Sequence, residues 1–344
     1  MKLFIVCNYP GGINAVIPVA QKLSVIGHDI SFVTSIDRRN YFRNICLPVI
    51  YINAKLSCQD VREMLIDYGV EITITGTTES YDQIVGRLEA IFISESNKVG
   101  INTISITDCW HKQKARFSLS ESNQIDVLPN KICVINDKAK SLMINDGFSE
   151  DIIYVTGNPG WDKLVGVRKR IARKKHYHKA IVFVSQPISE DDYNDIGYTE
   201  NEVLLDVLKL VNEDPLLLNA EVLIKMHPRE CPTKYNNLIG NKFGVKVSII
   251  DDSYDIYGLA QGAICSIGMF SMMLTEFFIL GFNAISYQPV SNKGSVIEVG
   301  LLENCVTTFN KLSEKIHSNK AISDIKVGNS TDNIIDLILN EENQ

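Results

Sequence analysis

The sequence lacks the features that mark membrane, metal-binding and nucleic-acid-binding proteins. Its 344 residues contain no apolar run of the about eighteen residues that a membrane-spanning helix needs. The formal net charge is −7, whereas general nucleic-acid binders usually carry a basic domain, so nucleic acid is not an expected partner. The eight cysteines form no Cys-x-x-Cys pair and no cluster with histidine at metal-ligand spacing. They are expected to be reduced core residues, and neither a metal nor a cofactor is predicted.

The composition is that of an ordinary globular protein, with 45% hydrophobic and 22% charged residues. A chain of this length suits two domains, each large enough to bury a core. The opening residues, MKLFIVCNYPGG, hold one lysine and a short apolar run before a turn, so they predict a first strand and not a signal peptide. The expected location is therefore the cytoplasm.

Short β-rich runs alternate with helical patterns along the whole chain, which is typical of βαβ units on a parallel sheet. Helices are expected between the strands, for example at 13–27, 58–69 and 81–100. The predicted strands of the first half lie at 2–7, 29–35, 49–53, 71–76, 102–108, 131–137 and 152–157. Those of the second half lie at 180–187, 221–228, 247–251, 263–268, 283–289 and 305–309.

A basic stretch separates the two halves. Residues 168–179, RKRIARKKHYHK, hold seven lysines or arginines and no acid, so they predict an exposed helix or linker. Such a stretch is either a solvated face or a site for an acidic polymer or for anionic lipid headgroups, which would give peripheral contact with the inner face of a membrane. We expect an N-terminal domain at 1–165, a C-terminal domain at 166–325, and a helix within 326–344 that packs back on the first domain.

Ligands of open parallel sheets bind beyond the carboxyl ends of the strands, so residues at strand ends are the first candidates for a site. Gly11 and Gly12 follow the first strand and precede a helix, where glycine lets the backbone approach a ligand and the helix start favours an anion. A plain tight turn is the alternative. Asp108 ends another strand and is either a general base or the cap of the next helix. The GNP sequence at 157–159 precedes the domain boundary and is either a ligand contact or a hinge-side loop.

In the second half, the stretch KMHPRE at 225–230 crowds basic groups at the end of an apolar strand, which favours an anionic ligand. A histidine before proline is more often structural, but a second anion-binding strand end follows at CSIGMFSMMLTE. There a serine hydroxyl and helix amides would hold a phosphate and a glutamate would hold ribose hydroxyls. We expect His227 and Ser271 to follow adjacent strands and to lie close together. The candidates are Lys225, His227, Arg229, Ser266, Gly268, Ser271 and Glu276, together with Gln186 at the end of the first strand of this half.

Taken in order, the Gly-Gly turn, the GNP sequence, KMHPRE and the spacing of Ser271, Glu276 and Gly281 resemble the two-domain GT-B glycosyltransferases. Within that group the His-Pro and the downstream serine are most similar to bacterial sialyltransferases and polysialyltransferases. The resemblance implies an α/β fold of two Rossmann-like domains with an interdomain cleft. It also implies that His227 meets the donor phosphate, with help from Ser266 or Ser271.

One departure concerns the sialyltransferase pattern, and another concerns a related family. The sialyltransferase pattern has an acidic pair followed by glycine ahead of the His-Pro, whereas here Asp191 and Asp192 are followed by Tyr193. Asp108 is therefore our first candidate base and Asp192 the substitute. The related UDP-N-acetylglucosamine 2-epimerases share the GNP and His-Pro but carry His-Arg-Arg-Glu-Asn where this chain has VSQPISE.

The sequence therefore predicts a metal-independent glycosyltransferase of surface polysaccharide synthesis. The N-terminal domain would bind a glycan or glycolipid acceptor and the C-terminal domain a nucleotide-sugar donor, with a CMP-linked nonulosonic acid ahead of a UDP-sugar. Asp108 would deprotonate the acceptor, while His227 and the anion-binding turns would stabilise the leaving phosphate. A nucleotide-sugar epimerase or hydrolase of the same fold is the alternative, and a binding module without turnover stays open.

Overall fold

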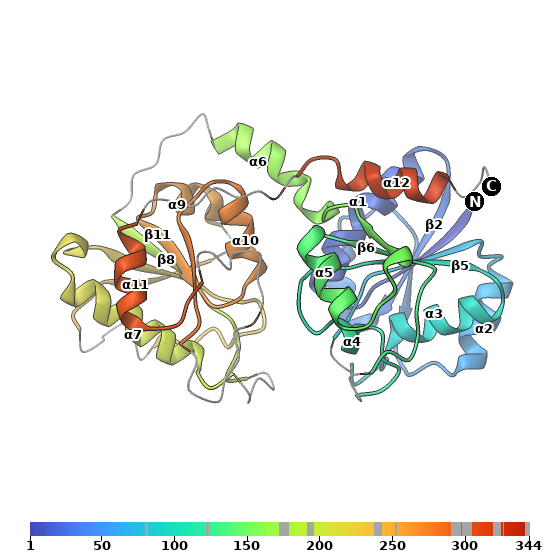
Figure 1. Ribbon diagram of the computed structural model, residues 1–344, viewed down its shortest axis with the longest axis horizontal. Helices are drawn as coiled ribbons and strands as arrows, with labels where there is room; N and C mark the ends of the chain where they lie inside the picture. The colour runs from blue at the N-terminus through green and yellow to red at the C-terminus, as the bar shows by residue number, and fades with distance from the viewer. Residues whose placement is uncertain are drawn as a thin grey trace. The chain divides into compact units, whose positions relative to one another are not determined.

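The computed structural model describes residues 1–79, 82–121, 124–171, 179–190, 196–236, 243–251, 253–289, 297, 305–318, 325 and 327–340. The chain divides into two compact units (Figure 1). Unit 1 consists of Met1–Val165 together with Lys326–Gln344, and unit 2 consists of Gly166–Ile325. The chain thus passes from unit 1 into unit 2 and returns to unit 1 at its end.

Unit 1 is built on a parallel sheet of seven strands among the described residues, in the order β3-β2-β1-β4-β5-β6-β7. The strands are β1 (Lys2–Val6), β2 (Asp29–Ser35), β3 (Val49–Ile52), β4 (Ile72–Thr75), β5 (Asn102–Ile106), β6 (Lys131–Val134) and β7 (Ile153–Val155). Each strand predicted in the first half is present. The order reverses direction between β1 and β4, so the ends of these strands form the switch point of the sheet.

The helices of unit 1 cover both faces of the sheet. Residues alternate along β1, so Leu3 and Ile5 pack in one core cluster with α1 (Pro10–Val25) and α12 (Ser330–Leu339), while Phe4 and Val6 pack in another with α2 (Cys58–Asp67) and α3 (Leu88–Lys98) (Figure 1). The other elements of the unit are η1 (Ile36–Phe42), α4 (Gln113–Arg116), α5 (Asp137–Asn145), η2 (Glu150–Ile152) and η3 (Pro159–Trp161). Helix α6 (Lys163–Ile171) begins in unit 1 and continues into unit 2.

Helix α3 begins later than the expected start at residue 81. Asp82 accepts hydrogen bonds through Oδ1 from the N–H groups of Ile84 (2.8 Å) and Val85 (2.9 Å). Gly86 then adopts a φ of 69°, a left-handed conformation that favours glycine. This turn competes with helix formation, so α3 starts at Leu88.

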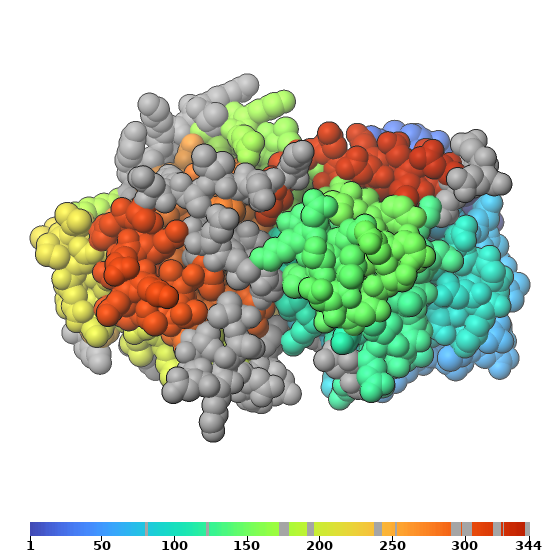
Figure 2. Space-filling model, in the orientation of Figure 1, coloured from blue at the N-terminus to red at the C-terminus, as the bar shows by residue number. Residues whose placement is uncertain are grey.

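The C-terminal helix α12 belongs to unit 1 and packs against α1 (Figure 2, where the red atoms lie over blue and green ones). Asp162 fixes its beginning, because its carboxylate accepts from the N–H groups of Gly328 (2.9 Å), Ser330 (3.2 Å) and Thr331 (2.8 Å) and from the Thr331 hydroxyl (2.7 Å). Gly157 of the GNP sequence has a φ of 89°, and a Cβ there would lie 2.4 Å from Oγ of Ser330. The glycine therefore leaves room for the start of α12.

Unit 2 holds a second parallel sheet, with six strands among its described residues in the order β10-β9-β8-β11-β12-β13. Its strands are β8 (Ala180–Val184), β9 (Glu221–Lys225), β10 (Val247–Ile250), β11 (Cys265–Gly268), β12 (Ala284–Tyr287) and β13 (Cys305–Val306). Its helices are α7 (Glu200–Glu213), η4 (Pro215–Leu217), α9 (Ile256–Gly262), α10 (Met272–Ile279) and α11 (Phe309–Ile316). The predicted α/β class with two Rossmann-like domains is confirmed.

Part of the basic stretch at 168–179 is described. Helix α6 ends at Ile171, and residues 172–178 lie outside the described ranges, as do Asp191 and Asp192. Arg168 donates to the carbonyl of Ile279 (2.6 Å) and Arg170 pairs with Asp255 (3.2 Å). Across the described residues, no helix is both long enough and apolar enough to span a bilayer.

Candidate functional site

Unit 2 has a pocket of about 340 Å³ at the carboxyl ends of its strands. The chain runs from β8 to β9 and β10 on one side and then to β11 on the other side of β8, so this edge contains the switch point at which open α/β sheets bind ligands. The pocket is lined by Val184, Ser185, Lys225, Met226, His227, Pro228, Asp251, Tyr254, Ile256, Ser271 and Met273. Three predicted site residues, Lys225, His227 and Ser271, therefore line one pocket.

His227 is half-buried in a tight turn directly after β9. Its main-chain N–H donates to Oε2 of Glu230 (2.7 Å), and its Nδ1 accepts from the N–H of Arg229 (3.2 Å). Because Nδ1 is the acceptor of this contact, the neutral ring carries its proton on Nε2. Nε2 is therefore a donor, as binding to a phosphate oxygen requires.

Ser271 is the N-cap of α10, and its Oγ accepts from the N–H of Met273 (3.3 Å). The start of a helix presents N–H groups and the positive end of the helix dipole, which favour an anion. We expected His227 and Ser271 to follow adjacent strands, and this is wrong, because β8 lies between β9 and β11. Both residues nevertheless line the same pocket, since the ends of all three strands meet at one edge of the sheet.

The other second-half residues predicted for the site are not among those that line the pocket: Gln186, Arg229, Ser266, Gly268 and Glu276. Gln186 accepts through Oε1 from the N–H of Phe270 (2.9 Å) and so ties the loop after β8 to the loop after β11. Glu276 accepts from the hydroxyl of Tyr257 (2.5 Å), and burial together with this carboxylate raises the pKa of Tyr257.

Ser266 and Gly268 belong to the interior of the sheet. Ser266 is fully buried, and a Cβ at Gly268 would lie 2.7 Å from the carbonyl oxygen of Val184. Gly268 therefore permits close contact between β11 and β8. Arg229 is exposed at the surface. The ligand-binding roles of these residues stay predictions.

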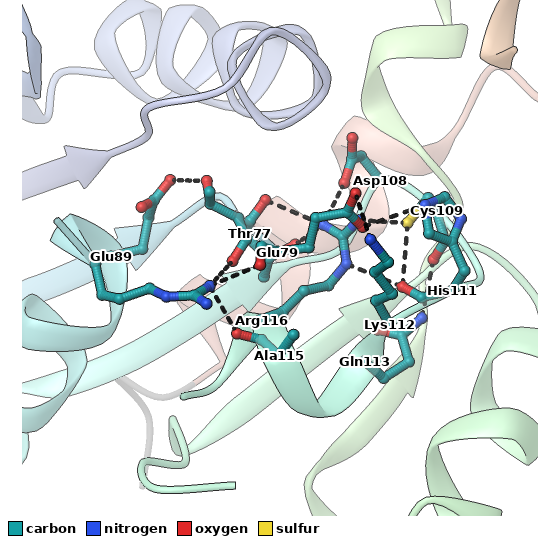
Figure 3. Close-up of polar contacts among 12 residues, drawn as sticks. Thr77, Glu79, Glu89, Asp108, Cys109, His111, Lys112, Gln113, Ala115 and Arg116 are labelled. Atoms are coloured by element: carbon teal, nitrogen blue, oxygen red, sulfur yellow. Dashed lines mark hydrogen bonds and ion pairs between the residues drawn. The ribbon is translucent and has the colours of Figure 1, made fainter. Parts of the chain in front are cut away.

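In unit 1, Asp108 lies just after β5, beside Arg116 (Figure 3) and beside Gly11. Its Oδ1 accepts from Nη1 of Arg116 (3.1 Å), and a Cβ built on Gly11 would lie 1.7 Å from its Oδ2. Gly12 packs less tightly, on the backbone of Gly76, where its Cβ would be 3.4 Å from the Cα, an ordinary contact distance. Gly11, Gly12 and Asp108 thus meet at the switch point of the first sheet. Asp108 does not cap the next helix, α4, whose N-cap is Lys112.

Arg116 is the centre of this cluster and is almost completely buried. Besides Asp108, its guanidinium donates to the carbonyl and hydroxyl of Thr77 (both 3.1 Å), to Oε2 of Glu79 (3.2 Å) and to Sγ of Cys109 (2.6 Å). A single cation therefore joins the loops that follow β4 and β5 (Figure 3).

His111 completes the cluster through Nε2, which pairs with Oε2 of Glu79 (3.2 Å). Burial opposes charge on both groups, but other contacts outweigh it: those with His111 and the neighbouring cations for Glu79, and those with Cys109 and Glu79 for His111. The pKa of Glu79 is lowered by the hydrogen bond from His111 and by the charges of Arg116, His111 and Lys112. The pKa of His111 is raised by Cys109 and by Glu79. Unit 1 therefore holds several ionisable groups in fixed contact at one sheet edge.

A second buried carboxyl, Glu89, lies beside this cluster (Figure 3). Its Oε1 accepts from the N–H of Asn8 (2.9 Å) and from the hydroxyl of Thr78 (2.7 Å). Burial raises the pKa of Glu89 despite these bonds. Arg87 is anchored nearby through three carbonyl oxygens, those of Thr78, Glu79 and Ala115.

Sequence analysis missed Glu79, Glu89 and Glu230. The rule that selected Asp108, an acid just past a strand, would also have selected Glu79, which follows β4 by four residues. Glu230 lies within the KMHPRE stretch, but its contact with the main chain of His227 depends on a turn that was not predicted from the sequence. Glu89 carries no signal, because an acid in the first turn of a helix is common. Among the described residues, no group of three or more His, Cys, Asp or Glu side chains could hold a metal ion.

Comparison with known proteins relates the chain to others by fold. The chain matches no protein-family model and no curated protein. It is similar to the solved UDP-GlcNAc 2-epimerase of Methanocaldococcus jannaschii in complex with UDP-GlcNAc and UDP, with a TM-score of 0.68 at 13% identity over 99% of this chain and 100% of that one. It is similar to the UDP-GlcNAc 2-epimerase of Neisseria meningitidis bound to UDP-GlcNAc, with a TM-score of 0.62 at 13% identity over 99% and 100%. The glycotransferase of kitacinnamycin gives a TM-score of 0.61 at 10% identity over 99% and 98%.

These similarities, together with the two parallel sheets, define a GT-B-like two-domain α/β fold. The fold is shared by epimerases and by a glycotransferase, so the fold alone does not decide between the two reactions.

Proposed function

We propose that the protein is an enzyme that binds a nucleotide sugar through its phosphates in the unit 2 pocket. The observation that carries this proposal is the convergence of Lys225, the Nε2 donor of His227 and the start of α10 at Ser271 on one pocket. Each of these groups favours an anion, and together they suit a diphosphate or a phosphodiester better than a neutral ligand. The pocket is also large enough for part of a small-molecule ligand, since such sites usually measure about 300–1,000 Å³.

We infer further that the reaction changes the sugar itself, by epimerisation or hydrolysis. Two solved structures of similar fold are UDP-GlcNAc 2-epimerases with nucleotide sugar bound. Epimerisation by deprotonation needs groups that remove a proton from the carbon and return one to its other face, and unit 1 offers Asp108, Glu79 and His111 in contact through Arg116. Asp108 stays our candidate base. The chain lacks the His-Arg-Arg-Glu-Asn stretch of the epimerases, and in its place Gln186 bonds within the protein, so the substrate need not be UDP-GlcNAc.

Glycosyl transfer is the second candidate, supported by the similarity to the glycotransferase of kitacinnamycin and by the order of the short motifs. In that reaction unit 1 would bind a glycan or glycolipid acceptor, and Asp108 would deprotonate its hydroxyl without a metal. A CMP-linked nonulosonic donor for capsule or another surface polysaccharide is the narrowest form of this hypothesis. The donor hypothesis rests on the His-Pro and serine motifs. Contact with a membrane is a separate hypothesis, which rests on the positive charge of residues 168–179.

Incubation with UDP-sugars and CMP-sugars, without any acceptor, separates these reactions. An isomerised sugar in the proton NMR spectrum identifies an epimerase, and free sugar released faster than in buffer identifies a hydrolase. If neither product forms but sugar is transferred when glycan acceptors are added, the protein is a transferase. If calorimetry shows no binding of UDP, CMP, CDP or GDP, the proposal is wrong.

A further inference from the structure

A buried carboxylate, that of Glu230, bonds to two residues that line the unit 2 pocket. The side chain of Glu230 has 0% exposure. Its Oε2 accepts from the N–H of His227 (2.7 Å), while its Oε1 accepts from the hydroxyl of Ser185 (2.6 Å). Ser185 follows β8 and His227 follows β9, and both line the pocket. One carboxylate therefore fixes the ends of two neighbouring strands relative to each other.

A negative charge in this position would oppose an anionic ligand unless a cation offset it. Lys234 supplies that cation, with its Nζ 3.0 Å from Oε1 of Glu230 and 2.6 Å from Oε1 of Glu200. Burial alone would lower the pKa of Lys234, but these carboxylates and Glu190 raise it, so the ammonium stays charged. The carboxylate can thus serve as an acceptor for the His227 turn, while Lys234, which it shares with Glu190 and Glu200, offsets part of its charge.

Resting on the proposed function of this pocket, we propose that Glu230 is a positioning residue for its anion-binding groups. It holds the turn in which the N–H of Arg229 meets Nδ1 of His227, and this contact keeps the proton of the ring on Nε2. Glu230 itself is not among the residues that line the pocket. Its effect on the ligand passes through the orientation and the tautomer of His227.

Two conservative variants separate the reach of the carboxylate from its charge. Glu230→Asp keeps the charge that pairs with Lys234 but is one methylene shorter, so it cannot bond both Ser185 and His227. Glu230→Gln keeps the length and one acceptor oxygen but removes the charge. Positioning requires the reach, so the Asp variant should be the more damaging of the two, whereas a role in charge balance alone would make the Gln variant worse.

A matched control comes from the capping box of α7. There Oε2 of Glu202 accepts from the N–H of Thr199 (2.7 Å), three residues earlier, as Oε2 of Glu230 does from the N–H of His227. Glu202 is not among the residues that line the His227 pocket. Glu202→Asp therefore shortens a carboxylate in the same kind of contact without touching the proposed site.

The experiment measures three quantities on the full chain: the affinity for UDP and CMP by calorimetry, the melting temperature, and the tautomer of His227. The tautomer is read from a long-range proton–nitrogen NMR spectrum of the six histidines without ligand, with His227 assigned from the loss of its signals in His227→Gln. We expect Glu230→Asp to weaken nucleotide binding about tenfold or more and to mix the tautomers of His227. Glu230→Gln and Glu202→Asp should keep the affinity within about threefold and the parent tautomer.

Equal affinity and an unchanged ring spectrum in Glu230→Asp would overturn the proposal, as would a larger loss in Glu230→Gln. A fall in melting temperature with neither of the other changes would assign Glu230 to stability alone. If the parent protein binds no nucleotide, the proposed function fails, but the ring spectrum still decides whether Glu230 controls His227.

Discussion

The main chain at Gly11 lies against the carboxylate of Asp108, so that a Cβ at Gly11 would be 1.7 Å from Oδ2. Gly11→Ala must therefore push the Asp108 side chain away from its position beside Arg116. If Asp108 is the base, we expect turnover to fall roughly 100-fold, as in Asp108→Asn, while nucleotide affinity is unchanged.

Because both substitutions act on one group, the double variant Gly11→Ala/Asp108→Asn should be little worse than either single variant. The control is Gly166→Ala in α6, where a Cβ would meet nothing within 4 Å. Full turnover in Gly11→Ala, measured with a nucleotide sugar on which the parent protein acts, would show that the position of Asp108 is not needed for the reaction.

Loss of the His227 ring should weaken nucleotide binding. The ring offers its Nε2 proton to a phosphate, and a hydrogen bond to a charged partner contributes roughly 1.5–3 kcal/mol. His227→Ala should therefore bind nucleotide roughly 10- to 150-fold more weakly by calorimetry, with little change in melting temperature. Cys231→Ala, just past the motif and exposed, should bind as the parent does. Parent-like affinity in His227→Ala would make the His-Pro a strand terminator only.

The ion pair between His111 and Glu79 should make stability depend on pH. The folded protein raises the pKa of His111 above its ordinary value of 6.5, so the pair stabilises the fold fully below that pH. This contribution is lost as the pH rises through the folded-state pKa. The pKa of Glu79 is lowered from 4.5, so its contribution is present above that pH and is lost on acidification.

The test compares the free energy of unfolding of the parent and His111→Gln between pH 6 and pH 9. We expect the difference between them to shrink by about 1 kcal/mol or more as the pH rises. The shrinkage should be smaller when both proteins also carry Glu79→Gln. A difference that is constant over this range would mean that His111 is neutral in the folded protein.

Asp162 should hold α12 on unit 1. Its carboxylate accepts from three main-chain N–H groups and one hydroxyl at the start of the helix. Asp162→Ala leaves those donors without this acceptor, so we expect a loss of roughly 2–4 kcal/mol and faster hydrogen exchange in α12 than elsewhere in unit 1. Asp336→Asn, on the exposed side of α12, is the control and should leave exchange unchanged. Uniform acceleration throughout unit 1 would show that α12 does not open separately.

Sequence reasoning located the strands because buried parallel strands read as apolar runs bounded by turn residues, and each such run forms a strand. It was less accurate where one side chain redirects the backbone, as Asp82 does ahead of α3. The order of strands in a sheet cannot be deduced from the sequence of the strands themselves. For this reason β9 and β11 were expected to be neighbours, although β8 lies between them.

The candidate site divides in the same way. Strand ends identified Asp108, His227 and Ser271, because position along a strand determines which edge a residue reaches. Partners such as Arg116 for Asp108 and Glu230 for His227 depend on how loops fold over one another. The resemblance to sialyltransferases favoured sialic-acid transfer, which stays a prediction, since short motifs shared across one fold do not determine the sugar.

The return of the chain to unit 1 has a consequence for synthesis on the ribosome. Ile334, Ile335 and Ile338 of α12 belong to the core on the α1 face of the first sheet, yet they are translated after all of unit 2. Unit 2 can therefore complete its core first. Until α12 is translated, the apolar α1 face of the unit 1 sheet is not fully covered. An unfinished chain would expose that face to chaperones, and shortening the C-terminus would damage the N-terminal unit before the one next to it in sequence.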